Sequence, residues 1–157
     1  MKHKLIFLLP LFLLCCYSKR EKLPVLNLLL IDSVTIFNTK NIPNGKPVLF
    51  MYFSPDCEHC QAETDSLLKN DSFLKQAICY FITIDPIERL RVFSTYYHIS
   101  NYPNIVLAKD YQFAFYNFFK PASTPFFIVY DKHKELYAVL PNGGNIKLIH
   151  SILTKIK

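Results

Sequence analysis

Two cysteines, a histidine between them and a glutamate after them lie within seven residues in the stretch "MYFSPDCEHCQAE", residues 51–63. Cys57 and Cys60 have the spacing Cys-x-x-Cys, His59 stands between them, and Glu63 follows. Such a pair can cycle between dithiol and disulfide, supply two ligands to a metal, or form a permanent bridge. The choice among these chemistries depends on the elements that hold the two sulfurs.

The residues on either side of the pair predict a junction between a strand and a helix. Residues 48–53 form a continuous apolar run, which is typical of a central strand covered on both faces. From Cys57 onward the sequence predicts a helix, with Asp56 or Cys57 at its cap. Residues three apart on a first helical turn lie on the same side, so the sulfurs can bridge. Free backbone N–H groups there favour a Cys57 thiolate as nucleophile, with a more buried Cys60 as the resolving thiol.

Hydrophobic patterning and turn residues predict the remaining elements. The expected helices cover residues 87–98, 111–119 and 145–156. The expected strands are two short runs within residues 25–38, a buried run at 77–85, an extended segment at 104–110, and a hairpin of 124–131 with 135–140. This order predicts the α/β class, with a mixed central β-sheet flanked by helices on both faces.

The chain resembles the thioredoxin superfamily, and within it the TlpA/ResA-like branch of exported, often membrane-tethered thiol-disulfide oxidoreductases. The resemblance rests on "VLFMYFSPDCEHCQAE" and on "STPFFIVYD", where a Thr-Pro pair opens the hairpin. It covers residues 34–157 and implies a thioredoxin-like fold. It also implies an enzyme that reduces protein disulfides through a redox-active Cys57–Cys60 pair.

The resemblance implies roles for further residues. Pro125 is expected to be cis and to face the redox sulfurs, with Thr124 offering backbone contacts to a substrate peptide. His59 is expected beside them as a third substrate-binding residue. Glu63 matches a glutamate of this branch and is the candidate acid/base for Cys60.

The chain departs from the pattern of that branch in one respect. It has no Trp, and Phe53 and Asp56 occupy positions where relatives often carry one. A carboxylate at Asp56 would disfavour the Cys57 thiolate, whereas a protonated His59 would favour it. The residues therefore leave the redox poise open, and a thiol oxidase or isomerase is an alternative to a reductase.

The cysteines also allow interpretations other than a redox pair. A zinc site needs four ligands, and no second Cys-x-x-Cys or paired His follows, so no metal and no cofactor is expected. A permanent disulfide closing so short a loop would constrain little. A copper carrier and a thiol peroxidase, the latter suggested by Ser54 before Cys57, remain alternatives. A non-catalytic thioredoxin-like binding module is the alternative of another class. Cys79 is expected to be a buried small hydrophobe.

The N-terminal residues predict an export signal. A basic start, "MKHK", precedes an apolar run at residues 5–14 that is too short to span a bilayer as a helix. "LLCC" resembles a bacterial lipoprotein signal, which makes Cys16 the expected lipidation site, with Cys15 as the alternative. The predicted organisation is a signal peptide at 1–16, a lead-in at 17–33 and the thioredoxin-like domain at 34–157. A cleaved signal or an uncleaved anchor would also export the domain.

Charge and location narrow the expected partners. The chain of 157 residues carries a net charge of +6, and its Lys and Arg residues form no stripe, so no nucleic-acid partner is expected. The predicted location is the periplasmic side of a membrane in a bacterial cell envelope. The expected partners are proteins with disulfides, a membrane electron donor for recycling, and the membrane itself through the lipid anchor.

Overall fold

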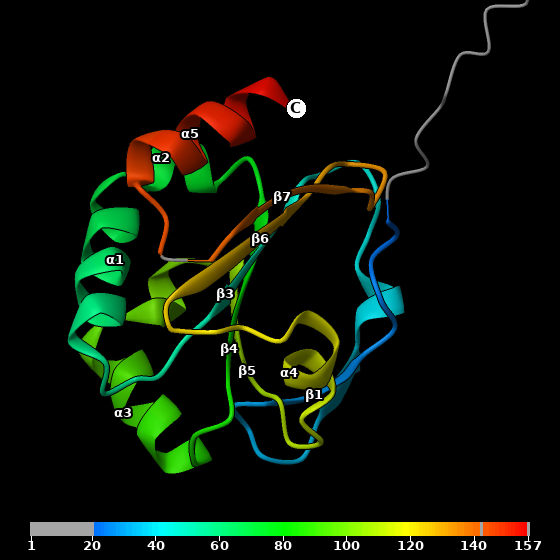
Figure 1. Cartoon of the computed structure of the whole chain (residues 1–157). Helices are drawn as coiled ribbons and strands as arrows, with labels where there is room; N and C mark the ends of the chain where they lie inside the picture. Colours follow the sequence, from blue (N-terminus) through cyan, green and yellow to red (C-terminus); the bar gives the residue numbers. More distant parts are fainter. Residues whose placement is uncertain (1–20, 142, 157) are drawn as a thin grey trace, which may run out of the picture.

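The structure is a computed structural model that describes residues 21–141 and 143–156 (Figure 1). The predicted signal peptide and the lipidation site at Cys16 lie outside these described residues. Within them, seven strands form one mixed sheet in the order β2-β1-β5-β4-β3-β6-β7. The predicted α/β class with a mixed central sheet is confirmed. No helix of the described residues is long and apolar enough to cross a membrane.

The predicted elements are present with small changes at their ends. The strands are β1 (Asn27–Leu30), β2 (Ile36–Asn38), β3 (Val48–Tyr52), β4 (Ile78–Thr83), β5 (Ile105–Lys109), β6 (Phe126–Tyr130) and β7 (Leu136–Leu140). The helices are α1 (Glu58–Lys69), α2 (Asp71–Leu74), α3 (Ile87–Tyr96), α4 (Ala114–Phe119) and α5 (Ile146–Lys155), with short 3-10 turns η1 (Thr39–Asn41) and η2 (Ile99–Asn101). The patterning did not predict α2, η1 or η2. The segment 104–110, expected as a strand or an extended loop, contains the strand β5.

Strand β3 is an interior strand of the sheet, between β4 and β6, and the loop of residues 53–57 that follows it, here called the redox loop, leads to Cys57 and Cys60. It pairs in parallel with β4 and antiparallel with β6, and all five of its residues are buried. This matches the continuous apolar run, because a strand covered on both faces has no polar face. The carboxyl end of β3 pairs Tyr52 with Phe126 of β6. That register brings the start of β6 next to the loop that follows β3.

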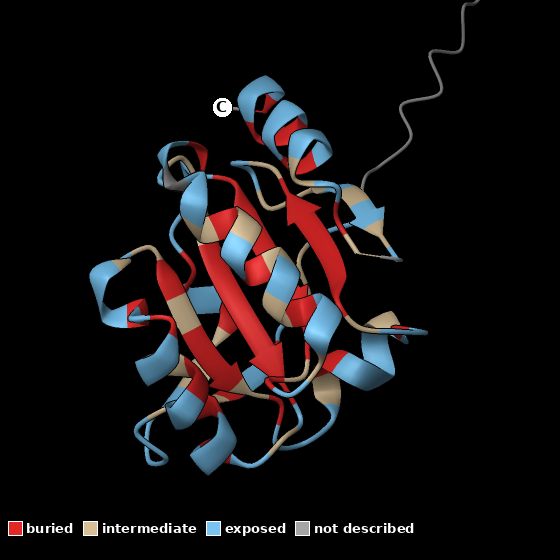
Figure 2. Cartoon of the chain, turned by 90° about the vertical axis from the view of Figure 1, so that its left-hand side faces the viewer, coloured by how far each residue is buried: buried red, intermediate tan, exposed pale blue. Residues whose placement is uncertain are grey.

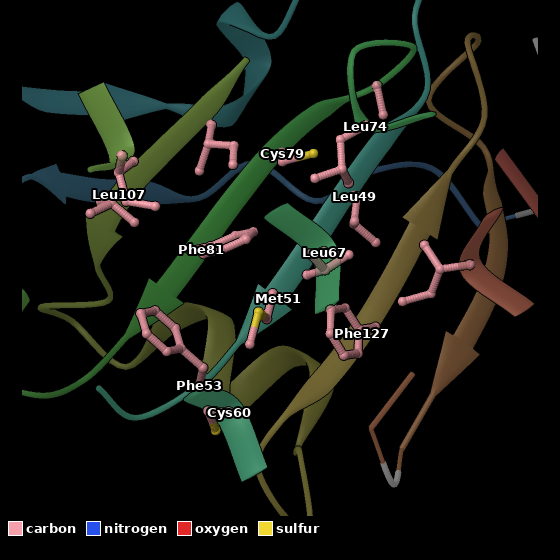
Figure 3. Packing of buried hydrophobic residues seen from close by; sticks show 14 of the residues in the cluster. Leu49, Met51, Phe53, Cys60, Leu67, Leu74, Cys79, Phe81, Leu107 and Phe127 are labelled. Carbon is pink, nitrogen blue, oxygen red and sulfur yellow. The ribbon is translucent and has the colours of Figure 1, made fainter. Parts of the chain in front are cut away.

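Helices cover both faces of the sheet, as predicted. Alternate residues of β3 point to opposite faces, so Leu49 and Met51 join one core cluster while Phe50 and Tyr52 join the other. The first cluster contains residues of α1, α2, α3 and α5, and the second contains Phe115 of α4. Figure 3 shows the first cluster, and Figure 2 shows the exposed outer surfaces of the helices over buried strands.

The sheet begins before residue 34. Strand β1 lies within residues 17–33, the segment predicted as a lead-in, and it pairs antiparallel with both β2 and β5. The turn predicted at Asp32 and Ser33 is present: the Asp32 carboxylate accepts hydrogen bonds from the backbone N–H groups of Val34 and Thr35. The described part of the lead-in is therefore part of the same sheet as the redox loop.

Candidate active site

Cys57 caps the helix that carries Cys60. It is the N-cap residue of α1, and its Sγ accepts a hydrogen bond from the backbone N–H of Cys60 at 3.3 Å. The sulfur thus occupies the place where unpaired N–H groups of a helix start point outward. Cys57 is partly exposed, whereas Cys60 is fully buried beneath it. The predicted difference in burial between the two thiols is therefore present.

The two thiols differ in acidity. Partial burial would raise the pKa of Cys57, but hydrogen bonds to its sulfur lower that pKa overall. The donors are the Cys60 thiol, the Thr124 hydroxyl and the backbone N–H groups of Cys60 and His59. Burial raises the pKa of Cys60 to about 12, and its hydrogen bond to Cys57 adds to the rise. Cys57 is the accessible thiol that can ionise, and Cys60 needs a base before it can react.

The loop before β6 completes the surroundings of Cys57. The Thr124 hydroxyl donates to Cys57 Sγ at 3.8 Å, and the Cys57 thiol donates to the Thr124 carbonyl at 3.9 Å. The Thr124–Pro125 peptide bond is cis. Pairing of β6 with β3 brings these residues to a cysteine that is 67 positions away in the sequence. The structure therefore places the Thr-Pro pair and the Cys-x-x-Cys pair at one site.

Glu63 and His59 lie on one side of this site. They line an open cavity of about 430 Å³ together with Thr124, Pro125 and Gly143, and with Ala62, Ser66 and Ser123. His59 is exposed at the surface of this cavity. Partial burial raises the pKa of Glu63, so its protonated form is favoured relative to a free glutamate. All the residues predicted for the site thus lie around one cavity and the adjoining sulfurs.

Gly143 belongs to this cavity and was not predicted from the sequence. Its φ is +80°, a value that side chains disfavour. A Cβ atom there would lie 3.5 Å from Glu63 Oε1 and 3.6 Å from Pro125 Cγ. The absence of a side chain keeps the space between these two residues open. The sequence "PNGG" after the last strand was the available signal.

Asp56, which the sequence suggested would disfavour the Cys57 thiolate, has a partner of opposite charge in the structure. Its carboxylate forms an ion pair with Arg89 of α3, and both side chains are exposed. The guanidinium offsets the charge that would otherwise disfavour the neighbouring thiolate. Arg89 is 33 positions away, and no pattern in the sequence linked it to the redox loop.

The cysteines of the described residues are all free. Cys57 and Cys60 form a dithiol, and Cys79 is fully buried in β4, as expected for a small hydrophobe. No group of three His, Cys, Asp or Glu side chains in residues 21–141 and 143–156 could hold a metal ion. The free dithiol of Cys57 and Cys60, with its unequal burial and acidity, is suited to thiol–disulfide exchange.

Comparison with known proteins shows what the chain is similar to. No protein-family model matches it, and no curated protein matches it significantly. Among solved structures, it is similar to DsbF of MTB, with a TM-score of 0.70, 15% identity, and coverage of 83% of this chain and 94% of that chain. It is also similar to a secreted Mycobacterium tuberculosis disulfide oxidoreductase homologous to E. coli DsbE, with a TM-score of 0.68, 16% identity, and coverage of 82% and 94%.

A third similar structure is a peroxiredoxin-like protein from Aquifex aeolicus, with a TM-score of 0.70, 12% identity, and coverage of 88% of this chain and 86% of that chain. At these identities the similarity shows the fold and leaves the reaction to be argued from the site. The predicted architecture is confirmed, and this chain has a thioredoxin-like fold.

Proposed function

We propose that the protein is an exported thiol-disulfide oxidoreductase that reduces disulfides in protein substrates through Cys57 and Cys60. The observation that carries the proposal is the asymmetry of the pair. Cys57 caps a helix, is partly exposed, and has a lowered thiol pKa. Cys60 is buried, and its thiol pKa is raised to about 12. A structural bridge has no need of such asymmetry, whereas sequential exchange uses an accessible nucleophile and a protected resolving thiol.

The proposed reaction has two exchange steps. The Cys57 thiolate attacks one sulfur of the substrate disulfide; a mixed disulfide forms, the substrate S–S bond breaks, and the leaving thiolate takes up a proton. Glu63 accepts the proton of Cys60, whose thiolate attacks Cys57 Sγ and releases the second substrate thiol. Two electrons have then passed to the substrate, and the protein holds a Cys57–Cys60 disulfide. A donor dithiol at the membrane restores it by the reverse exchange.

Three residues would hold the substrate next to Cys57. Thr124 and Pro125 form the wall of the cavity nearest the nucleophile, and His59 lies on its exposed side. A peptide that runs through this cavity could use the backbone of Thr124 for hydrogen bonds, as an added strand does. In this proposal the cavity binds the substrate, and Glu63 within it serves the second step.

The position at which the first described residues join the sheet bears on how a lipid anchor would orient the redox site. The backbone N–H of Leu136 donates to the carbonyl of Glu21 at 2.7 Å, and Leu136 pairs with Tyr130, which pairs with Val48 at the start of β3. Cys57 follows the opposite end of β3. If Cys16 carries a lipid, the five residues up to Glu21 reach at most about 18 Å. Anchoring would then direct the redox site away from the membrane surface, toward proteins of the cell envelope.

The remaining alternatives share the scaffold. A thiol oxidase or isomerase would use the same two thiols with electrons flowing the other way. A thiol peroxidase would be consistent with the similarity to a peroxiredoxin-like protein, which concerns the fold alone. A binding module would keep the cavity and make no use of the sulfurs. The unequal acidity and burial of the two thiols support the reductase over the binding module.

Insulin-disulfide reduction tests the proposal. In a coupled assay with dithiothreitol, Cys57→Ser is expected to abolish the acceleration that the native chain gives. In a separate incubation with insulin and no dithiothreitol, Cys60→Ser is expected to accumulate a mixed disulfide at Cys57. Cys79→Ala is the matched control, because Cys79 lies in the core and should leave the rate near that of the native chain. Retained acceleration in the folded Cys57→Ser variant would refute the proposed function.

A further inference from the structure

A second cavity flanks the redox loop on the side away from Glu63. It has a volume of about 660 Å³ and lies between α1 and α3, which run on the same face of the sheet (Figure 1). Pro55 and Asp56, just before Cys57, form one wall, and Gln61 of α1 lies beside them. Arg89 and the aromatic end of α3 form the opposite wall. Neighbours of Cys57 therefore line both cavities: Asp56, which precedes it, lines the second, and Thr124, whose hydroxyl donates to Cys57 Sγ, lines the first.

The second cavity has an exposed apolar pair in its lining, besides the polar side chains of Asp56, Gln61 and Arg89. Val92 and Tyr96 lie one helical turn apart on α3 and are 71% and 72% exposed, among the highest values for large apolar side chains in the described residues. Neither residue is buried in the core, and the Tyr96 ring meets the edge of the Tyr97 ring with centres 4.9 Å apart. An exposed apolar pair lining a cavity is typical of a surface that another molecule covers.

The floor of the cavity is already fixed in place. Phe93 and Tyr97 are buried beneath Val92 and Tyr96, with ring centres 4.6 Å apart. The Tyr97 hydroxyl donates to the Gln61 carbonyl at 3.3 Å and so ties the end of α3 to α1. Because Phe93 and Tyr97 are already ordered, a ligand that binds here does not lose free energy by ordering them.

The chemistry at Cys57 brings a polypeptide to this position. A disulfide joins two chain segments, and the nucleophile attacks one sulfur on the side opposite to the other. The two segments must therefore leave the reacting sulfurs in different directions. One cavity lies toward His59 and Glu63, and the other lies toward Asp56 and α3. Each can receive one segment of the partner that reacts with Cys57.

The charges at the second cavity favour no particular sign. Arg89 and Asp56 form an ion pair at its edge, so their charges largely cancel. The selective feature that remains is apolar contact with Val92 and Tyr96. The occupant that fits is a polypeptide with a large apolar side chain close to its reactive cysteine.

We propose that the cavity between α1 and α3 is a specificity site that binds a large apolar side chain next to the cysteine of the polypeptide that forms a mixed disulfide with Cys57. This inference rests on the proposed function, because it takes Cys57 as the exchanging thiol. Burial of one Phe or Leu side chain against this surface is expected to favour such a partner about tenfold over one with a small polar residue.

A competition for Cys57 tests the inference without requiring turnover. The full-length Cys60→Ser chain in detergent is equilibrated with equal amounts of two peptide disulfides that differ only in Phe or Ser beside the cysteine. Mass spectrometry then counts the two mixed disulfides at Cys57. The expected ratio is about ten in favour of the Phe peptide. Adding Val92→Ser with Tyr96→Ser is expected to bring the ratio close to one, whereas Tyr96→Phe, which keeps the ring, retains it.

Matched substitutions separate a specific effect from a general one. Val34→Ser with Leu148→Ser changes two exposed apolar residues elsewhere and is expected to keep the ratio near ten. Equal adducts in the parent chain, or a ratio that the double variant at Val92 and Tyr96 leaves unchanged, would overturn the inference. Unequal adducts in a protein that reduces no disulfide would refute the proposed function and leave this binding site supported.

Discussion

Removing the hydroxyl of Thr124 should make Cys57 a weaker acid. In the folded protein this hydroxyl donates to Cys57 Sγ at 3.8 Å, and it is one of the hydrogen bonds that hold the pKa of Cys57 below its usual value. Thr124→Val keeps the branched shape of the side chain and removes only the donor. The pKa of Cys57 is therefore expected to rise toward that of an ordinary thiol.

The size of the effect follows from the length of the bond. A hydrogen bond to a charged group contributes about 1.5–3 kcal/mol, and a long contact to sulfur should contribute less, about 0.7–1.4 kcal/mol. Since 1.4 kcal/mol is a factor of ten, the thiolate fraction below the titration midpoint should fall about three- to tenfold. The backbone N–H of Cys60 still donates at 3.3 Å, so the loss should be partial.

The assay is the rate of iodoacetamide alkylation of Cys57 measured across pH. Thr124→Val should move the titration midpoint to higher pH and slow alkylation by the stated factor on its acidic side. Ser123→Ala is the matched control, because the Ser123 hydroxyl donates to the Pro141 carbonyl instead of a sulfur. An unchanged profile in Thr124→Val, or an equal shift in Ser123→Ala, would refute the account of Cys57 acidity.

Three further predictions concern stability and charge. Burial raises the pKa of Glu63, so the folded state holds its proton more tightly, and native stability should decline as pH rises from about 4.5; Glu63→Gln should therefore raise Tm at pH 8 and not at pH 4, and an equal gain at both would contradict this. Leu67 of α1 is fully buried, so Leu67→Ala should lower the free energy of unfolding by about 2–5 kcal/mol in urea titrations. Leu148 is 47% exposed, so Leu148→Ala should lower it by under about 1 kcal/mol, and similar losses in both variants would contradict the core assignment. Arg89→Gln leaves a carboxylate unpaired before Cys57 and should slow its alkylation about twofold at low salt; a slowing that persists in about 1 M salt would argue against a charge effect.

Local patterns predicted the elements that hold the redox loop. The apolar run at Val48–Tyr52 indicated the central strand because no polar alternation interrupts it, and the residues after Cys57 indicated the helix. A short helix such as α2 gave no signal, since four residues carry too little periodicity to recognise. The role of the segment before residue 34 was likewise beyond local patterning, because its pairing with β5 joins distant parts of the chain.

Only those residues of the site that belong to a sequence motif were predicted. Cys57 and Cys60 are three positions apart in the sequence, and the resemblance supplied Thr124 as their distant neighbour. Arg89 and Gly143 follow no motif, and only the folded chain shows that they meet Asp56 and Glu63. The cavity between α1 and α3 was also unforeseen, because it depends on how two helices from separate segments lie together.

The reduction potential of the Cys57–Cys60 pair tests the central claim most directly. The full chain in detergent would be equilibrated with glutathione and dithiothreitol buffers of known potential, and the oxidised fraction measured by thiol alkylation and mass spectrometry. The account predicts one reversible two-electron couple nearer to the about −270 mV of thioredoxin than to the about −120 mV of DsbA. A value near the upper limit would contradict the reductase direction, and the absence of any reversible couple would contradict the redox function itself.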